Sequence, residues 1–232
     1  MIRNGIVIAV YGQSNHLPTC LESLKMNTLI PYDLLVIDTK SPRISLAKAW
    51  NRAISMLNSE IITVLNDDTI VGKNWLELQT QTLLSKGNIG LVSPTVSKCG
   101  NKWQVKPFEL LSNKNVESFS VNDASELSEK IYAEYHGKTK ECGHDISGAC
   151  MTFRKETWKD VNGFDERFFP AYGEDSDFFD KLLFKGLKLV WDMQSYVHHF
   201  GGQTAKIVPD LNRKFTSDLY WKKLKERQRI CR

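Results

Sequence analysis

Short apolar runs alternate with segments of helical spacing along the first hundred residues of the chain. The apolar runs lie at 5–11, 33–38, 60–65 and 89–93. The segments of helical spacing lie between them, at 17–24, 45–57 and 75–84. Short apolar runs are typical of buried strands, whereas apolar residues every three or four positions predict helices. Strands that alternate with helices in this way predict an α/β fold, with a largely parallel sheet built from right-handed crossovers.

The second half of the chain follows a looser pattern. Between 99 and 142, short polar runs interrupt the periodicity, and a helix is predicted only over 124–135. This segment fits a substrate-facing variable region and a simple surface excursion equally well. Order resumes with a strand-like run at 146–154. The remaining predicted elements are a short helix from 156, a helix from 174 to a Gly186 cap, a strand at 187–191, the S-Y-V-H-H run at 195–199 and a tail helix.

Length and composition favour one large α/β domain over two small ones. The chain has 232 residues, of which 41% are hydrophobic and 25% are charged, close to globular averages. No run reaches the roughly 18 apolar residues of a membrane span, and the N-terminus does not resemble a signal peptide. Five scattered cysteines without a C-x-x-C pair indicate free thiols rather than disulfides or structural zinc. We therefore expect a cytoplasmic protein.

The net charge of +4 is concentrated at the C-terminal end. Residues 206–232 contain nine Lys or Arg and three acids, so the remaining residues sum to −2. We expect a body over 1–205 and a basic helical tail over 206–232. The tail fits a peripheral contact with an anionic membrane, an acidic acceptor, self-association with a partner subunit, or a solvated helix docked by its apolar face. The near-neutral body does not indicate a nucleic-acid binder.

Candidate chemistry first appears where the run at 60–65 ends in Asn66, Asp67 and Asp68. In open α/β sheets, ligands bind beyond the carboxyl ends of the strands, and two adjacent acids there suggest a metal and a phosphorylated ligand. The same three residues also suit a turn and helix cap. Neither G-x-G-x-x-G nor G-x-x-x-x-G-K-[ST] follows the first strand, which argues against a dinucleotide oxidoreductase and a phosphate-loop NTPase.

A second group of acids begins the helix at 174. Glu174, Asp175 and Asp177 fall in its first turn. The helix dipole stabilises acidic side chains at this position, and that stabilisation alone explains one or two of them. Three in four positions exceed what capping requires. We interpret Asp177 as a structural partner and expect Asp180, farther along the helix, to face solvent.

Six motifs in order make the sequence resemble the family-2 glycosyltransferases. They are V-I-D-T at 36–39, L-N-D-D-T at 65–69, S-G-A at 147–149, G-F-D-E-R-F-F at 163–169, G-E-D-S-D-F at 173–178 and H-H-F-G-G-Q-T at 198–204. Each motif is weak alone, but the ordered set, spanning 6–204, is specific. The resemblance implies a Rossmann-like GT-A fold and inverting transfer of a sugar from a nucleotide diphosphate donor, with a UDP-sugar favoured, to an acceptor hydroxyl. It divides the body into a nucleotide-sugar-binding half, 1–98, and an acceptor-binding and catalytic half, 99–205.

The resemblance also implies roles for individual residues. Donor contacts fall on Tyr11, Asp38, Asn51 and Asp67. The metal ligands would be Asp68 and His199, and the catalytic pair would be Asp175 as base with Glu174 beside it. Small side chains at Gly148 and Ala149 would let the acceptor approach the backbone, although small residues there also serve packing. Two departures stand out: Asn66 occupies the first acid position of the metal motif, and Lys40 leaves the shape of the loop after the second strand open.

The chemistry of such a transfer needs these groups. Mg²⁺ or Mn²⁺ neutralises the charge that develops on a departing diphosphate, and oxygen ligands such as Asp68 suit either ion. Inversion needs a base opposite the leaving group, and a carboxylate at a helix start stays ionised. Alternation along a strand directs His198 and His199 to opposite faces, so at most one should be a ligand. Two other functions remain: a catalytically lapsed nucleotide-sugar or glycan binding module, and a sugar nucleotidyltransferase, which the lack of a Gly-rich phosphate loop disfavours.

Overall fold

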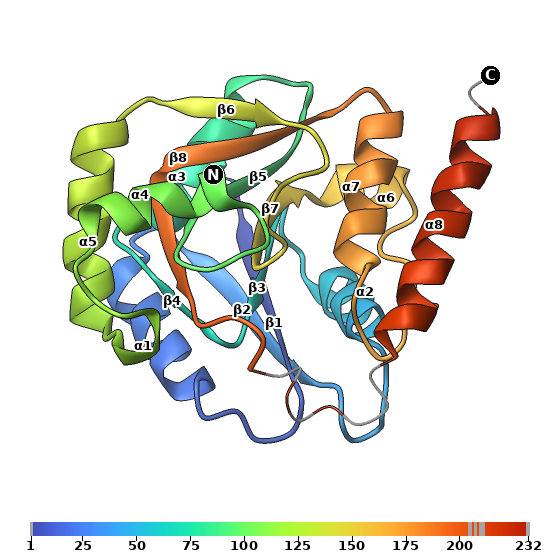
Figure 1. Ribbon diagram of the computed structural model, residues 1–232, viewed down its shortest axis with the longest axis horizontal. Coiled ribbons are helices and arrows are strands. Elements are labelled where there is room, and N and C mark those ends of the chain that lie inside the picture. The colour runs from blue at the N-terminus through green and yellow to red at the C-terminus, as the bar shows by residue number, and fades with distance from the viewer. Residues whose placement is uncertain (1, 204–205, 207, 209–211, 231–232) are drawn as a thin grey trace.

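A central sheet flanked by helices organises the computed structural model, which describes residues 2–203, 206, 208 and 212–230 (Figure 1). The strands are β1 (Asn4–Val10), β2 (Tyr32–Asp38), β3 (Ile61–Asn66), β4 (Thr69–Val71), β5 (Ile89–Val96), β6 (Thr139–Cys142), β7 (Cys150–Arg154) and β8 (Lys188–His199). The helices are α1 (Leu17–Asn27), α2 (Leu46–Met56), α3 (Trp75–Ser85), α4 (Lys102–Leu111), α5 (Val121–Tyr135), α6 (Lys155–Asp160), α7 (Glu174–Phe184) and α8 (Arg213–Ile230), with a 3-10 turn, η1 (Val116–Ser118).

The sheet in the described residues is mixed, in the order β2-β1-β3-β7-β5-β8-β4, with β6 also on β8. Strand β1 pairs in parallel with β2 and β3, and β5 pairs in parallel with β8. Strand β7 runs antiparallel between β3 and β5, and β4 and β6 run antiparallel to β8. The predicted α/β fold with a helix-flanked sheet is confirmed, and most of its strands share one direction.

Two hydrophobic clusters cover the two faces of the sheet. On one face, Trp50 of α2 and Phe178 of α7 pack against strands β1, β3 and β7. On the other face, Leu24 of α1 and Trp75 of α3 pack against β1, β3 and β4. All four side chains are at most 2% exposed, so the apolar positions that predicted these helices form the core.

Strand β7 brings a distant segment to the end of β3. Cys150 pairs with Leu65, and the Asn66 N–H donates to the Ala149 carbonyl at 3.0 Å. Because β7 is antiparallel to β3, it begins where β3 ends. The tip of β3 and the 147–149 segment therefore lie at one edge of the sheet.

Strand β8 is a single strand of twelve residues, although the sequence pattern indicated two runs. The pairing of β5 with β8 shifts register between Pro94 and Thr95, which face Asp192 and Tyr196. This irregularity interrupts the apolar pattern at 192–194 while the backbone remains extended. At its end His199 pairs with Thr69 of β4, so the histidine reaches the residues that follow β3.

The loosely patterned segment 99–142 contains more order than the sequence predicts. Helix α4 was not expected, and Asn101 caps it by accepting from the Gln104 N–H at 3.1 Å. Helix α5 begins three residues before the predicted start, with Ser120 and Asp123 forming a capping box. These caps are local signals that the apolar periodicity does not contain.

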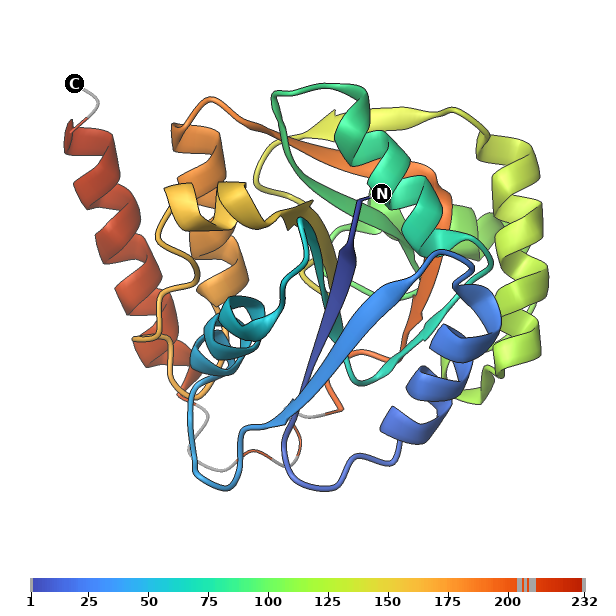
Figure 2. The ribbon, with the colours of Figure 1, turned by 180° about the vertical axis from the view of Figure 1, so that it is seen from behind.

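Helix α8 lies beside α7 at the outer edge of the molecule (Figures 1 and 2). Its contact with α7 is ionic: the fully buried Asp177 pairs with Lys223 at 2.7 Å and with Arg227 at 2.5 Å. Lys223 also pairs with Asp165. The inward side of α8 thus combines these charged residues with the half-buried Leu219, Tyr220 and Leu224. Thr204 of the last motif, and the residue before the expected boundary at 205/206, lie outside the described residues.

The other general expectations concern cysteines and membrane spans. Cys20, Cys99, Cys142 and Cys150 are free thiols, as expected, and Cys231 lies outside the described residues. Within the part of the chain that the structure describes, no helix is both long and apolar enough to cross a bilayer.

Candidate active site

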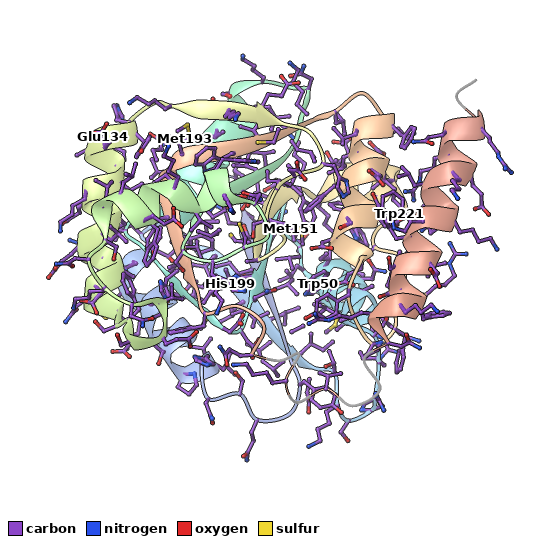
Figure 3. All side chains as sticks on the ribbon, viewed as in Figure 1. Trp50, Glu134, Met151, Met193, His199 and Trp221 are labelled. Carbon is purple, nitrogen blue, oxygen red and sulfur yellow. The ribbon has the colours of Figure 1, made fainter. Side chains whose placement is uncertain are left out.

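A cavity of about 580 Å³ opens at the sheet edge where β3 ends and β7 begins. Its lining joins residues from distant parts of the chain, and Figure 3 shows His199 on β8 and Trp50 on α2, one on either side. We call Asn66, Asp67, Asp68 and His199 the strand wall. We call Gly148, Glu174 and Asp175 the helix wall. The two acid groups that the sequence singles out thus face one space.

The strand wall is built around a close pair of side chains. Nε2 of His199 lies 3.3 Å from Oδ1 of Asp68, and both residues are largely buried. The Gln203 N–H donates to the other carboxylate oxygen of Asp68 at 3.4 Å. The Asp68 carbonyl also accepts from the Phe200 N–H at 3.0 Å, which ties the tip of β3 to the end of β8. His199 belongs to the second half of the chain, but it lies on the strand wall, beside residues of the first half.

The other ring nitrogen of His199 determines what its Nε2 can do. Nδ1 lies 2.7 Å from the Lys98 carbonyl, and because a carbonyl only accepts, Nδ1 must carry a proton. Nε2 therefore points at Asp68 either with a second proton or with a lone pair. Burial alone would lower the pKa of His199, but the hydrogen bond and charge of Asp68 outweigh it and raise that pKa. For Asp68, burial is likewise outweighed by His199, and its pKa is lowered.

This pair fits a divalent cation. A metal can replace the proton between Nε2 and Oδ1, because both atoms are then available ligands on one side of the cavity. The described residues contain no group of three or more His, Cys, Asp or Glu side chains that could hold a metal. Two protein ligands are nevertheless usual for an ion that completes its coordination with phosphate oxygens and water.

The helix wall presents a carboxylate at the start of α7. Gly173 precedes the helix with φ of +96°, a conformation that glycine adopts easily, and it directs Glu174 and Asp175 toward the cavity. Oδ1 of Asp175 accepts from the Ser176 N–H at 2.7 Å and lies 3.4 Å from Ser176 Oγ. A Cβ at position 148 would lie 3.0 Å from Cγ of Asp175, so only glycine leaves room for this carboxylate.

The two acids of the helix wall differ in their hydrogen bonds and in their pKa. Burial, followed by the charge of Asp175, raises the pKa of Glu174 to about 8, and one of its carboxylate oxygens is buried with no hydrogen-bond partner among the described residues. Burial also raises the pKa of Asp175, but the two Ser176 donors oppose that rise. At neutral pH Glu174 holds a proton, and Asp175 is the better acceptor of one.

Three predicted donor residues lie outside the lining of this cavity. Asp38 accepts from the Gly12 N–H at 2.9 Å and the Lys40 N–H at 2.8 Å, and these bonds lower its pKa and brace the loop after β1. Tyr11 sits beside that loop, with Lys40 Nζ 5.9 Å from the centre of its ring. Asn51 donates to the Phe164 carbonyl at 2.8 Å and accepts from the Phe164 N–H, so the structure shows it anchoring the 163–166 turn.

The two adjacent histidines divide as strand alternation predicts. His198 is fully buried, lies 3.0 Å from the Tyr196 hydroxyl and stacks on Phe119 at 4.1 Å. Burial lowers the pKa of His198 to about 4. His198 is therefore a core residue, and His199 is the one that lines the cavity.

Two further residues of the lining, His144 and Tyr172, were not predicted from the sequence. His144 lies 3.0 Å from Asp180 and 3.4 Å from the Tyr220 hydroxyl, and the bond to Asp180 raises its pKa. The expectation that Asp180 faces solvent was wrong, because it is 5% exposed. Tyr172 lines the cavity with φ of +80°, unusual for a large side chain. Neither residue lies in a periodic segment, and an isolated His or Tyr in a loop gives no signal of its own.

The chain is similar to one protein family and to solved structures. The sequence profile of Glycosyltransferase like family 2 matches residues 6–224 and so extends into α8. The solved structure of GalNAc-T7 with UDP, GalNAc and Mn²⁺ is 12% identical, with a TM-score of 0.61 over 85% of this chain and 44% of that one. Mannosyltransferase PcManGT from Pyrobaculum calidifontis, in complex with GDP-Man and Mn²⁺, is 13% identical, with a TM-score of 0.58 over 84% and 56%.

The similarity to these two structures concerns the fold. The chain spans about half the length of the two structures, and at such low identity the likeness shows a shared fold, which is GT-A. No curated protein matches the sequence.

Proposed function

Because this chain belongs to Glycosyltransferase like family 2, we propose that it is a metal-dependent inverting glycosyltransferase that moves a sugar from a nucleotide diphosphate donor to an acceptor hydroxyl. The observation that carries the proposal is the arrangement of the cavity. An ionised carboxylate paired with an imidazole stands on one wall, and a carboxylate with hydrogen-bond donors on one oxygen stands on the other. The structures of similar fold that contain UDP or GDP-Man with Mn²⁺ support the donor class.

The strand wall holds the donor in this proposal. Asp68 and His199 would bind Mn²⁺ or Mg²⁺, and that ion, when bound, supplies a Lewis acid for the diphosphate that leaves. Asp67 lies in the same lining and is assigned to the donor. Tyr11, Asp38 and Asn51 lie outside the lining, so a role in holding the nucleoside would have to be exerted from the rim of the cavity.

The helix wall performs the proton transfer. The acceptor oxygen attacks the anomeric carbon, the bond from that carbon to the diphosphate oxygen breaks, and the acceptor proton passes to Asp175. Ser176 favours the ionised form of Asp175 because its N–H donates to Oδ1. Attack from the side opposite the leaving group inverts the anomeric carbon.

Glu174 and the small residues at 148 and 149 assist this step. A neutral Glu174 leaves Asp175 as the charged member of the pair, and the acceptor proton then passes to Asp175 and not to Glu174. Gly148 and Ala149 keep the backbone bare at the point where the acceptor would approach Asp175. We place the reaction in the cytoplasm, a reducing compartment that suits the four free cysteines of the described residues.

Calorimetry and product analysis test the proposal. Titration with UDP should show binding that strengthens when Mn²⁺ is added, and Asp68→Ala should lose that increment. Equal Mn²⁺-dependent binding by wild type and Asp68→Ala would refute the metal assignment. GDP serves as the competing nucleotide. With a donor identified, NMR of the product should show the anomeric configuration opposite to the donor's, whereas full donor binding without turnover would favour the lapsed binding module.

A further inference from the structure

Helix α8 buries charged side chains and exposes two of its three aromatic ones. Lys223 is 7% exposed and pairs with the fully buried Asp177, whereas Phe215 is 52% exposed and Trp221 is 54% exposed. A helix that only covers a protein normally turns its aromatic side chains inward and its lysines outward. The exposed side of α8 therefore requires a separate explanation.

The exposed residues form one continuous surface. A spacing of seven residues is close to two helical turns, so Lys214 lies in line with Trp221, and Phe215 lies in line with Lys222 and Arg229. Lys225 lies one turn beyond Trp221 in the same half of the helix. We call these six residues the outward face of α8. Figures 1 and 2 show α8 at the edge of the molecule, and Figure 3 shows Trp221 on it.

The outward face has a positive charge that docking to α7 does not neutralise. The cations that pair with α7 are Lys223 and Arg227, which belong to the other side of the helix. The outward face retains four cations, with the exposed Asp218 among them and the exposed Glu226 at its border, so its net charge stays positive. An attached partner should therefore be anionic.

We propose that the outward face of α8 binds the surface of an anionic lipid bilayer. Trp and Phe side chains insert at the headgroup level, while lysine and arginine stems lie along the interface with their charges on lipid phosphates. Protein interfaces are a poorer match, because lysine is depleted at their centres. A glycan is also a poorer match, because sugar-sized ligands bind in concave pockets and this surface is the convex side of one helix.

Vesicle flotation tests this proposal without any donor or acceptor, so its outcome is independent of the proposed activity. The protein should float with phosphatidylcholine vesicles that contain about one third phosphatidylglycerol, and not with phosphatidylcholine alone, at about 0.1 M salt. In the triple variant Trp221→Ala/Lys222→Ala/Lys225→Ala, each lost lysine should weaken binding about 5-fold, giving roughly 25-fold or more in total. All three side chains are exposed, so the thermal midpoint should not change.

A matched control lies on the opposite edge of the molecule. Helix α5 carries the exposed Tyr132 and Lys130, and Lys130→Ala/Tyr132→Ala should float like the wild type. Equal flotation with neutral and anionic vesicles would overturn the proposal, as would equal loss in the α5 and α8 variants. Analytical ultracentrifugation covers the remaining occupant: a wild-type dimer that Trp221→Ala dissociates, without vesicle binding, would assign the outward face to a second copy of the chain.

Discussion

The two walls of the cavity hold their carboxylates in opposite electrostatic conditions. On the strand wall, Asp68 is buried, but its pairing with His199 outweighs the effect of burial, and the pKa of Asp68 is lowered. On the helix wall, burial raises the pKa of both Glu174 and Asp175, and the charge of Asp175 raises the pKa of Glu174 further. Burial acts to raise the pKa on both walls, and on the strand wall the hydrogen bond and charge of His199 outweigh it.

This difference separates two tasks that carboxylates can perform. A carboxylate that stays charged suits a cation and a diphosphate, whereas one whose pKa is raised suits proton transfer. The walls come from different elements, the tips of β3 and β8 on one side and the start of α7 on the other. A substitution on one wall should therefore impair one task and leave the other intact.

Asp175→Asn should have the largest effect. Removal of the base should lower kcat by about 10²- to 10⁴-fold, because the amide cannot accept the acceptor proton. Calorimetry should show unchanged affinity for the donor nucleotide, since the strand wall is intact. Asp145→Asn, a carboxylate in the same lining, is the matched control and should retain activity. Comparable loss in both variants would remove the distinction between Asp175 and its surroundings.

Gly148→Ala should displace the same carboxylate without changing its chemistry. The new Cβ would lie 3.0 Å from both Cβ and Cγ of Asp175, so the side chain must move. A misplaced base should lower kcat by roughly 10²-fold. At Gly143 an added Cβ has no neighbour within 4 Å, so Gly143→Ala is the control. Normal kcat in Gly148→Ala would show that the position of Asp175 does not limit the reaction.

Glu174→Gln should reveal the raised pKa of Glu174 as a change in stability with pH. The folded protein holds the Glu174 proton up to a pKa of about 8, against 4.5 for the ordinary side chain. The folded state thus binds more protons within this window, and the free energy of unfolding should fall by about 1.4 kcal/mol per pH unit from this group. Glutamine should remove that slope in urea titrations at several pH values between 5 and 8.

Glu22→Gln on α1 is the matched control for this measurement, because Glu22 is exposed. It should keep the wild-type slope. If Glu174→Gln kept the same slope as well, Glu174 would be charged in the folded protein at neutral pH, and the contrast between the walls would fail.

Ser176→Ala should have the smallest effect. It removes the Ser176 Oγ donor, 3.4 Å from Asp175, but leaves the N–H bond at 2.7 Å. The pKa of Asp175 should rise, so on the acid limb of the pH profile kcat/KM should fall roughly 3-fold, while the plateau at higher pH is retained. An equal fall at all pH values would indicate a positional effect and not a titration.

Much of this site was predictable from the sequence because its residues sit at the ends of regular elements. Asp68 follows a continuous apolar strand and Asp175 begins an amphipathic helix, so periodicity locates both, and the ordered motifs relate them. Strand alternation also predicts that His198 and His199 face opposite sides, and the family motif favours His199 as the ligand. These are local rules, and local rules act over a few residues.

The parts that were not predictable depend on contacts between distant segments. Asp180 has the spacing of a solvent-facing residue, but α8 and His144 cover it. Asn51 lies on α2 and bonds to the Phe164 backbone, a partner more than a hundred residues away. In the sequence, Lys223 and Arg227 are typical of a solvated basic tail. In the structure, both pair with the buried Asp177. Charge pattern alone cannot tell a free cation from a paired one.

Strand β8 also has a consequence for motion. It is hydrogen-bonded to β5 along one side and to β4 and β6 along the other, so His199 at its end is fixed to the rigid body of the sheet. Asp175, in contrast, follows the irregular segment 161–173, and α7 is tied to α8 by ion pairs. If the cavity closes on a substrate, we expect the segment 161–173 to move, because α7 itself is packed on the sheet through the buried Phe178 and Phe179.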